Sequence, residues 1–235
     1  MMQRYRIDIY EGQYAVATVI KKVVAEFAGT AILVCVVVGS GIMGTNLSDD
    51  TLVALLVNGL STIFVLGILI LTLGPVSGAH FNPLVTLALT VSKQFPTKQI
   101  LPYVLSQVLG GIYGAIIANA MFGQAIFQIS TTARFNAGTA IGEVMATTLL
   151  LFVILSLLRT DRANLIALAV PGVIGAAYFF TSSTSFANPA VTIGRIFSDT
   201  FAGIAPESVL GFIAFQIVGA AIALGLVNLM FAKKR

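Results

Sequence analysis

The chain has 235 residues, of which 57% are hydrophobic and only 9% are charged, and its mean hydropathy is +0.98. Soluble domains carry about 25% charged residues, so the composition excludes an ordinary soluble enzyme and indicates a membrane protein. The single His and single Cys are too few for a metal site of several ligands or for a disulfide. A net charge of +4 is too small and too scattered for a nucleic-acid groove.

Six stretches are apolar enough to cross a bilayer, which takes roughly 20 residues. They are 23–43, 52–73, 101–121, 140–158, 165–181 and 209–231. The residues before the first stretch include several charges and no apolar segment, so we expect no cleavable signal peptide. The pattern predicts an all-α membrane protein with six transmembrane helices.

Basic residues predict the orientation of these helices, because loops rich in Lys and Arg stay in the cytoplasm. An even number of spans places both termini on one side, and nearly all Lys and Arg residues fall on that side. The opposite side holds Arg134 and Arg195. We therefore expect both termini to be cytoplasmic.

Two connections between the spans are too apolar to be ordinary loops. Each contains a short polar stretch, an Asn-Pro pair and about ten largely apolar residues, beginning at Asn82-Pro83 and Asn188-Pro189. Asn is a common N-cap of helices, and Pro is common at the first helical position. Ten helical residues rise about 15 Å, half the thickness of the hydrocarbon layer. Each connection therefore predicts a re-entrant half-helix.

The two halves of the chain resemble each other. Glu26 corresponds to Glu143, and Gln107 corresponds to Gln216. Each half has three spans, so the second half enters the membrane from the opposite face. This pattern predicts one channel domain, 1–235, with inverted repeats at approximately 20–121 and 138–231 and a site at the midplane where the broken helices meet.

The predicted site disfavours cations, because two half-helix N-termini bring partial positive charges together. Asn82 and Asn188 can donate hydrogen bonds to a neutral molecule with a lone pair. The segments before each Asn are not helical, so their carbonyl groups need partners. We expect these carbonyls to face a single file of permeating molecules. They belong to Gly78, Ala79, His80 and Phe81 in the first loop and to Thr184, Ser185 and Phe186 in the second. Such a pore needs no cofactor.

Several polar residues within the spans are candidates for function or support. Glu26 and Glu143 either carry protons or ions, or accept hydrogen bonds from backbone N–H groups in the non-helical segments. The second hypothesis is favoured because neither residue has an evident mobile cationic partner. We expect Gln107 and Gln216 to support helix packing through hydrogen bonds. His80 either gates the cytoplasmic mouth by protonation or is fixed by hydrogen bonds, and the fixed role is favoured.

These features resemble the aquaporin family, also called major intrinsic proteins. The resemblance covers essentially the whole chain and rests on residues 25–30, 77–83, 107–111 and 188–190. It implies six spans with two half-helices, and a homotetramer in the lipid bilayer with a pore for water and small neutral solutes in each subunit. The paired motifs are Asn82-Pro83-Leu84, where Leu84 replaces the usual Ala, and Asn188-Pro189-Ala190.

The resemblance also implies an outer selectivity filter of four residues, here Thr62, Ala176, Ser185 and Val191. Val191 stands where the family normally has Arg, and Asn58 is an alternative to Thr62 in the lining. The Asp of glycerol facilitators is also missing, with Thr192 in its place. All four filter residues are small and uncharged, so the resemblance implies a wide and weakly polar constriction.

This replacement resembles bacterial aquaporins found with arsenic-resistance genes, which are implicated in passing arsenite. The resemblance implies a bacterial inner-membrane channel that conducts metalloid acids, which are neutral and rich in hydroxyl groups. Arg195 lies one turn beyond Val191 on the same face. Arg195 either swings inward and partly replaces the missing charge, or it faces the outer vestibule or a lipid headgroup. The second placement, at the vestibule or a headgroup, is favoured.

An ion-coupled secondary transporter is the alternative, because inverted repeats and broken helices also occur there. It would need Glu26 and Glu143 to bind the coupling ion. An intramembrane enzyme is disfavoured, since the spans contain no paired Asp, no His-Glu-x-x-His motif and no Ser–His set.

Overall fold

The computed structural model describes residues 2–231, and the side chains of residues 18–231. This part of the chain is helical and has no strand. The long helices are α1 (Met2–Leu47), α2 (Thr51–Ser77), α4 (Ile100–Met121), α5 (Ala137–Arg159), α6 (Ile166–Phe180) and α8 (Pro206–Met230). Shorter pieces are α3 (Pro83–Val91), α7 (Pro189–Gly194) and the 3₁₀ turns η1 (Thr97–Gln99), η2 (Ala163–Leu165) and η3 (Arg195–Phe197).

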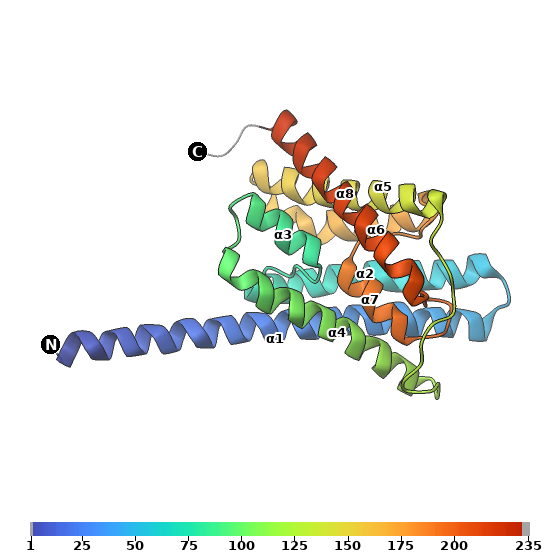
Figure 1. Ribbon diagram of the computed structural model, residues 1–235, viewed down its shortest axis with the longest axis horizontal. Coiled ribbons are helices and arrows are strands. Elements are labelled where there is room, and N and C mark those ends of the chain that lie inside the picture. The colour runs from blue at the N-terminus through green and yellow to red at the C-terminus, as the bar shows by residue number, and fades with distance from the viewer. Residues whose placement is uncertain (1, 232–235) are drawn as a thin grey trace.

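Six helical stretches of the described residues are long and apolar enough to cross a membrane. They are Thr18–Leu47, Thr51–Ser77, Thr97–Met121, Ala137–Arg159, Ala163–Phe180 and Pro206–Met230. The predicted six-helix architecture is therefore confirmed, with most ends lying a few residues outside the predicted limits. Figure 1 shows the start of α1 and the end of α8 at the same end of the bundle.

The two short helices α3 and α7 lie inside the bundle. Figure 1 shows that they begin near its middle and run toward opposite ends. Each follows an extended Asn and has Pro in its first turn. The Asn-Pro pairs therefore begin half-helices, as the sequence predicts.

Glycine allows the closest contacts between the long helices. In the first half α1 packs against α4, and in the second half α5 packs against α8. A Cβ atom added to Gly219 would lie 2.6 Å from the carbonyl oxygen of Val144, and one added to Gly114 would collide with the carbonyl oxygen of Ala31. Each half of the bundle therefore contains helices whose backbones approach too closely for a larger residue.

Candidate functional site

Asn82 and Asn188 cap the two half-helices. The side-chain oxygen of Asn82 accepts a hydrogen bond from the backbone N–H of Leu84 at 2.9 Å. The side-chain oxygen of Asn188 accepts one from the backbone N–H of Ala190 at 3.0 Å. Both side chains therefore use their oxygen for capping and keep their amide nitrogen for other partners.

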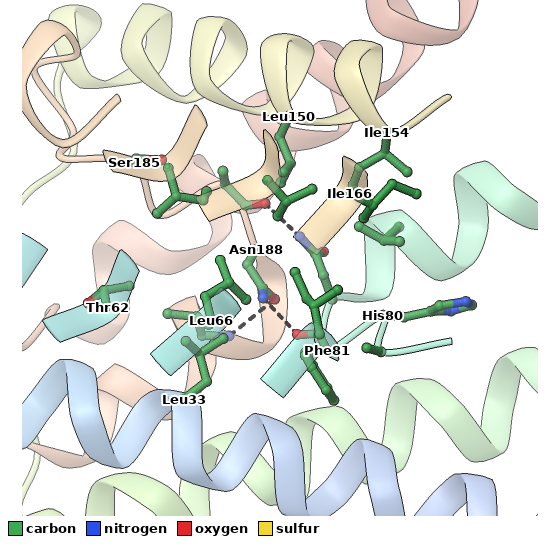
Figure 2. A pocket seen from close by; sticks show the side chains of 18 of the residues that line it. Leu33, Thr62, Leu66, His80, Phe81, Leu150, Ile154, Ile166, Ser185 and Asn188 are labelled. Atoms are coloured by element: carbon green, nitrogen blue, oxygen red, sulfur yellow. Dashed lines mark hydrogen bonds between the residues drawn. The ribbon is translucent and has the colours of Figure 1, made fainter. Parts of the chain in front are cut away.

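The amide nitrogens of the two asparagines connect the halves of the chain. Asn82 Nδ2 donates to the carbonyl of Ala187 at 2.8 Å, and Asn188 Nδ2 donates to the carbonyl of Phe81 at 2.8 Å. Figure 2 shows the second of these bonds at the centre of the site. The N-termini of α3 and α7 are thus held together deep inside the bundle. Each amide retains a second N–H that can serve a solute.

The loops before the half-helices contain several residues in the left-handed region. Their φ values are 50° at Ala79, 47° at Phe81, 58° at Thr184, 57° at Ser185 and 45° at Ala187. Such conformations cost a non-glycine residue of order 1–3 kcal/mol and persist only where surrounding contacts hold them. Both loops therefore need strong support from their neighbours.

Glu26 supports the first loop. Its Oε1 accepts hydrogen bonds from Ser77 Oγ at 2.6 Å and from the backbone N–H of His80 at 3.0 Å. Its Oε2 accepts from the backbone N–H of Phe81 and from Gln107 Nε2, both at 2.7 Å. The carboxyl group is fully buried and meets four donors, which favours the static interpretation of this residue.

Glu143 supports the second loop in the same way. Its Oε1 accepts from the backbone N–H of Phe186 at 3.0 Å, and its Oε2 accepts from that of Ala187 at 2.9 Å. Gln216 Nε2 donates to the same Oε2 at 2.5 Å. The repeat in sequence is therefore matched by a repeat in hydrogen bonding, in which one carboxyl group holds each loop.

Two threonines complete this network, and sequence reasoning missed their role. Gln107 Nε2 also donates to Thr86 Oγ1 at 3.1 Å, and Gln216 Nε2 donates to Thr192 Oγ1 at 3.0 Å. Both threonines stand four residues after an N-cap Asn, in the first turn of a half-helix. This shared spacing is visible in the sequence and could have identified the pair.

A cavity of about 270 Å³ passes both asparagines. Figure 2 shows leucine and isoleucine side chains around Asn188. Most of the wall is aliphatic and comes from Leu33, Val37, Leu66, Ile70, Val85, Leu89, Leu150, Ile154, Leu158, Ile166, Val170 and Ile174. Among the described residues of the lining, only Arg195 has a permanently charged side chain.

The backbone loops form the polar part of this wall. Of the expected carbonyl ladder, the lining includes Gly78, Ala79, His80, Phe81, Ser185 and Phe186. Thr184 is not part of the lining, which corrects the expectation for this residue. Its N–H donates to the carbonyl of Thr181 at 3.3 Å, so the chain is still turning out of α6 there. Ala187, which was not predicted, lines the cavity.

His80 is held by fixed contacts at one end of the cavity. Its Nδ1 lies 3.0 Å from Thr86 Oγ1, and its ring packs against Phe95 and Tyr103 with centroid distances of 4.9 and 5.2 Å. Figure 2 shows the ring directed away from Asn188. Burial, with a smaller contribution from Lys22, lowers the pKa of His80 to about 4, so the ring is neutral at pH 7.

Comparison with known proteins identifies the family to which this arrangement belongs. Residues 13–181 match the sequence profile described as major intrinsic protein. The chain belongs to the major intrinsic protein family. It is therefore an aquaporin-type channel for water and small solutes, and a passive channel rather than an enzyme.

Relatives of this major intrinsic protein occur in bacteria, archaea and eukaryotes. It is 40% identical to the aquaglyceroporin AqpS of Rhizobium meliloti, with 92% of each chain covered. It is 31% identical to aquaporin AqpM of Methanothermobacter marburgensis, over 78% of this chain and 85% of that one. The crystal structure of the aquaglyceroporin from Plasmodium falciparum has the same fold, with a TM-score of 0.63 at 22% identity, and the match covers 90% of this chain and 99% of that chain.

Three of the four expected filter residues lie in the pore of this channel. Thr62, Ser185 and Val191 are buried and line the cavity. Figure 2 shows Thr62 and Ser185 on the opposite side of Asn188 from His80. Thr62 and Ser185 therefore lie toward the end of the cavity opposite to His80.

Ala176 does not lie in the pore, which corrects the filter prediction. It is exposed on the outer side of α6. The residues of α6 that line the cavity are Ile166, Val170, Ile174 and Tyr178. Because helical residues four apart share a face, a position two residues after Ile174 points away from the lumen. Tyr178 lines the cavity instead, with its hydroxyl 3.1 Å from Thr62 Oγ1.

Arg195 was expected at the outer vestibule or at a lipid headgroup, and only the headgroup placement is inconsistent with the structure. It is only 4% exposed and lines the cavity, so it does not face a lipid headgroup. Its Nε donates to the carbonyl of Ala202, and its guanidinium carbon lies 3.5 Å from the centre of the Phe186 ring. The chain tightens into the 3₁₀ turn η3 at this residue, so the face of α7 does not simply continue.

Two further residues named from the sequence lie outside the lumen. Asn58 Nδ2 donates to the carbonyl of Val37 at 2.6 Å and to Ser40 Oγ at 3.0 Å, so this side chain joins α2 to α1. Leu84 is buried in the core beside the lumen and is absent from its lining. Neither residue lines the cavity.

Proposed function

We propose that this channel conducts small neutral solutes that carry hydroxyl groups, including metalloid acids such as arsenous acid, together with water. The observation that carries the proposal is Val191. This residue lines the pore three positions after Asn188, where the family normally has Arg. A short aliphatic side chain there leaves more room and less charge beside the second half-helix than an Arg would.

The lining suits such solutes. Hydroxyl groups can accept hydrogen bonds from Asn82 and Asn188 and donate them to loop carbonyls, while the carbon or metalloid centre slides along the aliphatic wall. The relative AqpS is named an aquaglyceroporin, and arsenous acid, like glycerol, is a small neutral molecule with three hydroxyl groups. No step of this passage needs a bond to be made or broken.

Ion-coupled transport finds little support in the site. It would require Glu26 or Glu143 to bind an ion or release a proton during transport. Both carboxyl groups accept hydrogen bonds from two backbone N–H groups and from a glutamine amide. Moving either carboxyl group would release a left-handed loop that shapes the pore.

We further propose a homotetramer in the inner membrane of a bacterium, with both termini in the cytoplasm. Support comes from the bacterial relative AqpS and from the large apolar side chains on the outer faces of the helices, such as Phe64, Leu168 and Leu210. Chemical cross-linking in membranes and labelling of a cysteine added near either terminus would test the assembly and the orientation.

The decisive experiment uses proteoliposomes that contain the purified channel. Stopped-flow light scattering would measure water and glycerol permeability, and uptake assays would measure arsenous acid. We expect each flux to rise linearly with its gradient and to persist when proton and sodium gradients are abolished. Saturable flux that requires either ion gradient would refute the proposal.

A substitution at Val191 tests the filter assignment. Val191→Arg is expected to lower glycerol and arsenous acid permeability several-fold while water still passes. Val191→Ile is the matched control, because it adds bulk without charge. Unchanged solute permeability in Val191→Arg would show that this residue does not set the width of the pore.

A further inference from the structure

The pore has a fixed positive charge, Arg195, but not at position 191, where the family normally has Arg. Arg195 lines the same cavity as Val191 and Ser185, four residues after Val191 and on the outer side of the half-helix. Its side chain is almost entirely withdrawn from the molecular surface. The channel has therefore not lost the outer arginine altogether but has one in a different position.

Contacts hold the Arg195 side chain in one orientation. Its Nε donates to the carbonyl of Ala202, and its guanidinium group lies over the Phe186 ring at 3.5 Å. Phe186 is itself fixed, because its backbone N–H donates to Glu143 and its ring packs against Phe212 at a centroid distance of 4.9 Å. A guanidinium held over an aromatic ring and bonded to a backbone carbonyl has little freedom to leave the pore wall.

The other nitrogens of Arg195 are available to the lumen. The structure gives neither Nη1 nor Nη2 a hydrogen-bond acceptor among residues 18–231. A guanidinium group has five N–H donors, and only the one on Nε is used. The charge remains on the residue at pH 7, since burial and the neighbouring Arg134 lower its pKa only to about 9.

Arg134 holds the loop against which Arg195 rests. It comes from the segment between α4 and α5, and it donates from Nε to the carbonyl of Gly203 at 2.5 Å and from Nη2 to that of Phe201 at 2.7 Å. Its guanidinium carbon lies 5.7 Å from the centre of the same Phe186 ring. Arg134 thus fixes both residues that flank Ala202, whose carbonyl accepts from Arg195.

We propose that Arg195 is a specificity-determining residue of the outer pore, where it excludes cations and donates hydrogen bonds to solute hydroxyl groups, with Arg134 as its positioning residue. The proposal rests on the proposed function, since it assigns a role within the same pore. A fixed charge in a lumen walled by protein repels a cation more strongly than the same charge in bulk water. The space beside Val191 can then be wide without becoming a path for ions.

Proteoliposomes containing Arg195→Met test this role, with sodium leak followed by a trapped sodium-sensitive dye and water permeability followed by stopped flow. We expect sodium leak to rise about tenfold or more, because the local repulsion is lost, while water permeability changes less than about twofold. Arg195→Lys keeps the positive charge, and its sodium leak is expected to stay near the wild-type value. Arg162→Met, in the exposed loop after α5, is the matched control for loss of one arginine.

A double variant that moves the positive charge from position 195 to position 191 tests whether the charge itself prevents sodium leak. In Val191→Arg/Arg195→Met the positive charge returns one turn further in, and sodium leak is expected to fall toward the wild-type value. Arg134→Met is expected to raise sodium leak by a smaller factor without reducing water flux. If Arg195→Met does not assemble, Arg195→Gln removes the charge with a polar side chain, and the same leak is expected.

The outcomes separate this inference from the proposed function. Wild-type liposomes without water or glycerol flux would contradict the channel proposal itself. Normal water and glycerol flux in the wild type, with no increase in sodium leak in Arg195→Met or Arg195→Gln, would overturn only the role of Arg195. The half-helix N-termini would then be sufficient to exclude cations.

Discussion

Replacing Glu26 by Gln tests whether the buried carboxyl group holds the first pore loop. The carboxylate accepts four hydrogen bonds, two on each oxygen. An amide keeps one oxygen but turns the other acceptor into an NH₂ donor. If the NH₂ group takes the place of Oε2, it faces the N–H of Phe81 and the Nε2 of Gln107. Each buried donor left without an acceptor costs about 1–3 kcal/mol, so the two together predict a loss of roughly 2–6 kcal/mol.

The assay is thermal unfolding in detergent, followed by helical circular dichroism and by size-exclusion recovery after heating. Water permeability in proteoliposomes supplies the functional readout, because the loop carbonyls line the pore. Glu207→Gln is the matched control, since Glu207 is exposed in the first turn of α8. We expect the control to unfold like the wild type and Glu26→Gln to unfold at a clearly lower temperature.

The reasoning fails if Glu26→Gln matches the wild type in both unfolding temperature and water permeability. A variant of normal stability that conducts water but has lost a proton-dependent flux would instead support the mobile interpretation of this carboxyl group. Glu143→Gln provides an internal comparison, because its carboxyl group holds the second loop in the same way, accepting from two backbone N–H groups and a glutamine amide.

Two other predictions follow from the structure. Water permeability is expected to stay constant between pH 8 and 5.5, because His80 has a pKa lowered to about 4 and so remains neutral throughout this range; a step near the ordinary histidine pKa, seen by stopped flow, would contradict its fixed role. Gly219→Ala is expected to lower the unfolding temperature, since the new methyl group would meet the Val144 carbonyl, at a cost of about 1–3 kcal/mol for overpacking. Gly225→Ala, which has open space around it, is the control and is expected to be neutral or stabilising; equal unfolding temperatures for the two variants would contradict the close contact of α5 and α8.

The architecture could be predicted from the sequence because each element has a strong local signal. Long apolar runs predict the spans, and Asn82-Pro83 and Asn188-Pro189 predict the half-helices, which α3 and α7 confirm. The two Glu and two Gln residues were identified as support because buried polar groups need partners. Their specific partners, including Thr86 and Thr192, depend on loop geometry that no periodicity encodes.

The outer filter was harder to predict because it depends on exact direction. Counting residues back from Asn188 selects Ala176, but the face of α6 that meets the lumen passes through Ile174 and Tyr178. An error of two residues along α6 therefore selects the methyl group of Ala176 in place of the phenol of Tyr178 as the side chain that faces the lumen. The spacing of four residues does place Arg195 on the side of Val191, but its contacts with Ala202 and Phe186 depend on the 3₁₀ turn and on loops that the sequence does not reveal.

The reciprocal bonds of the two asparagines bear on how the protein is made. Asn82 finds its carbonyl partner in the second half of the chain, and Asn188 finds its partner in the first. While the ribosome has delivered only the first three spans, the amide of Asn82 and the carbonyl of Phe81 lack these partners. The hydrogen bonds at the centre of the protein can therefore form only after both halves have entered the bilayer, so the pore is completed late in biosynthesis.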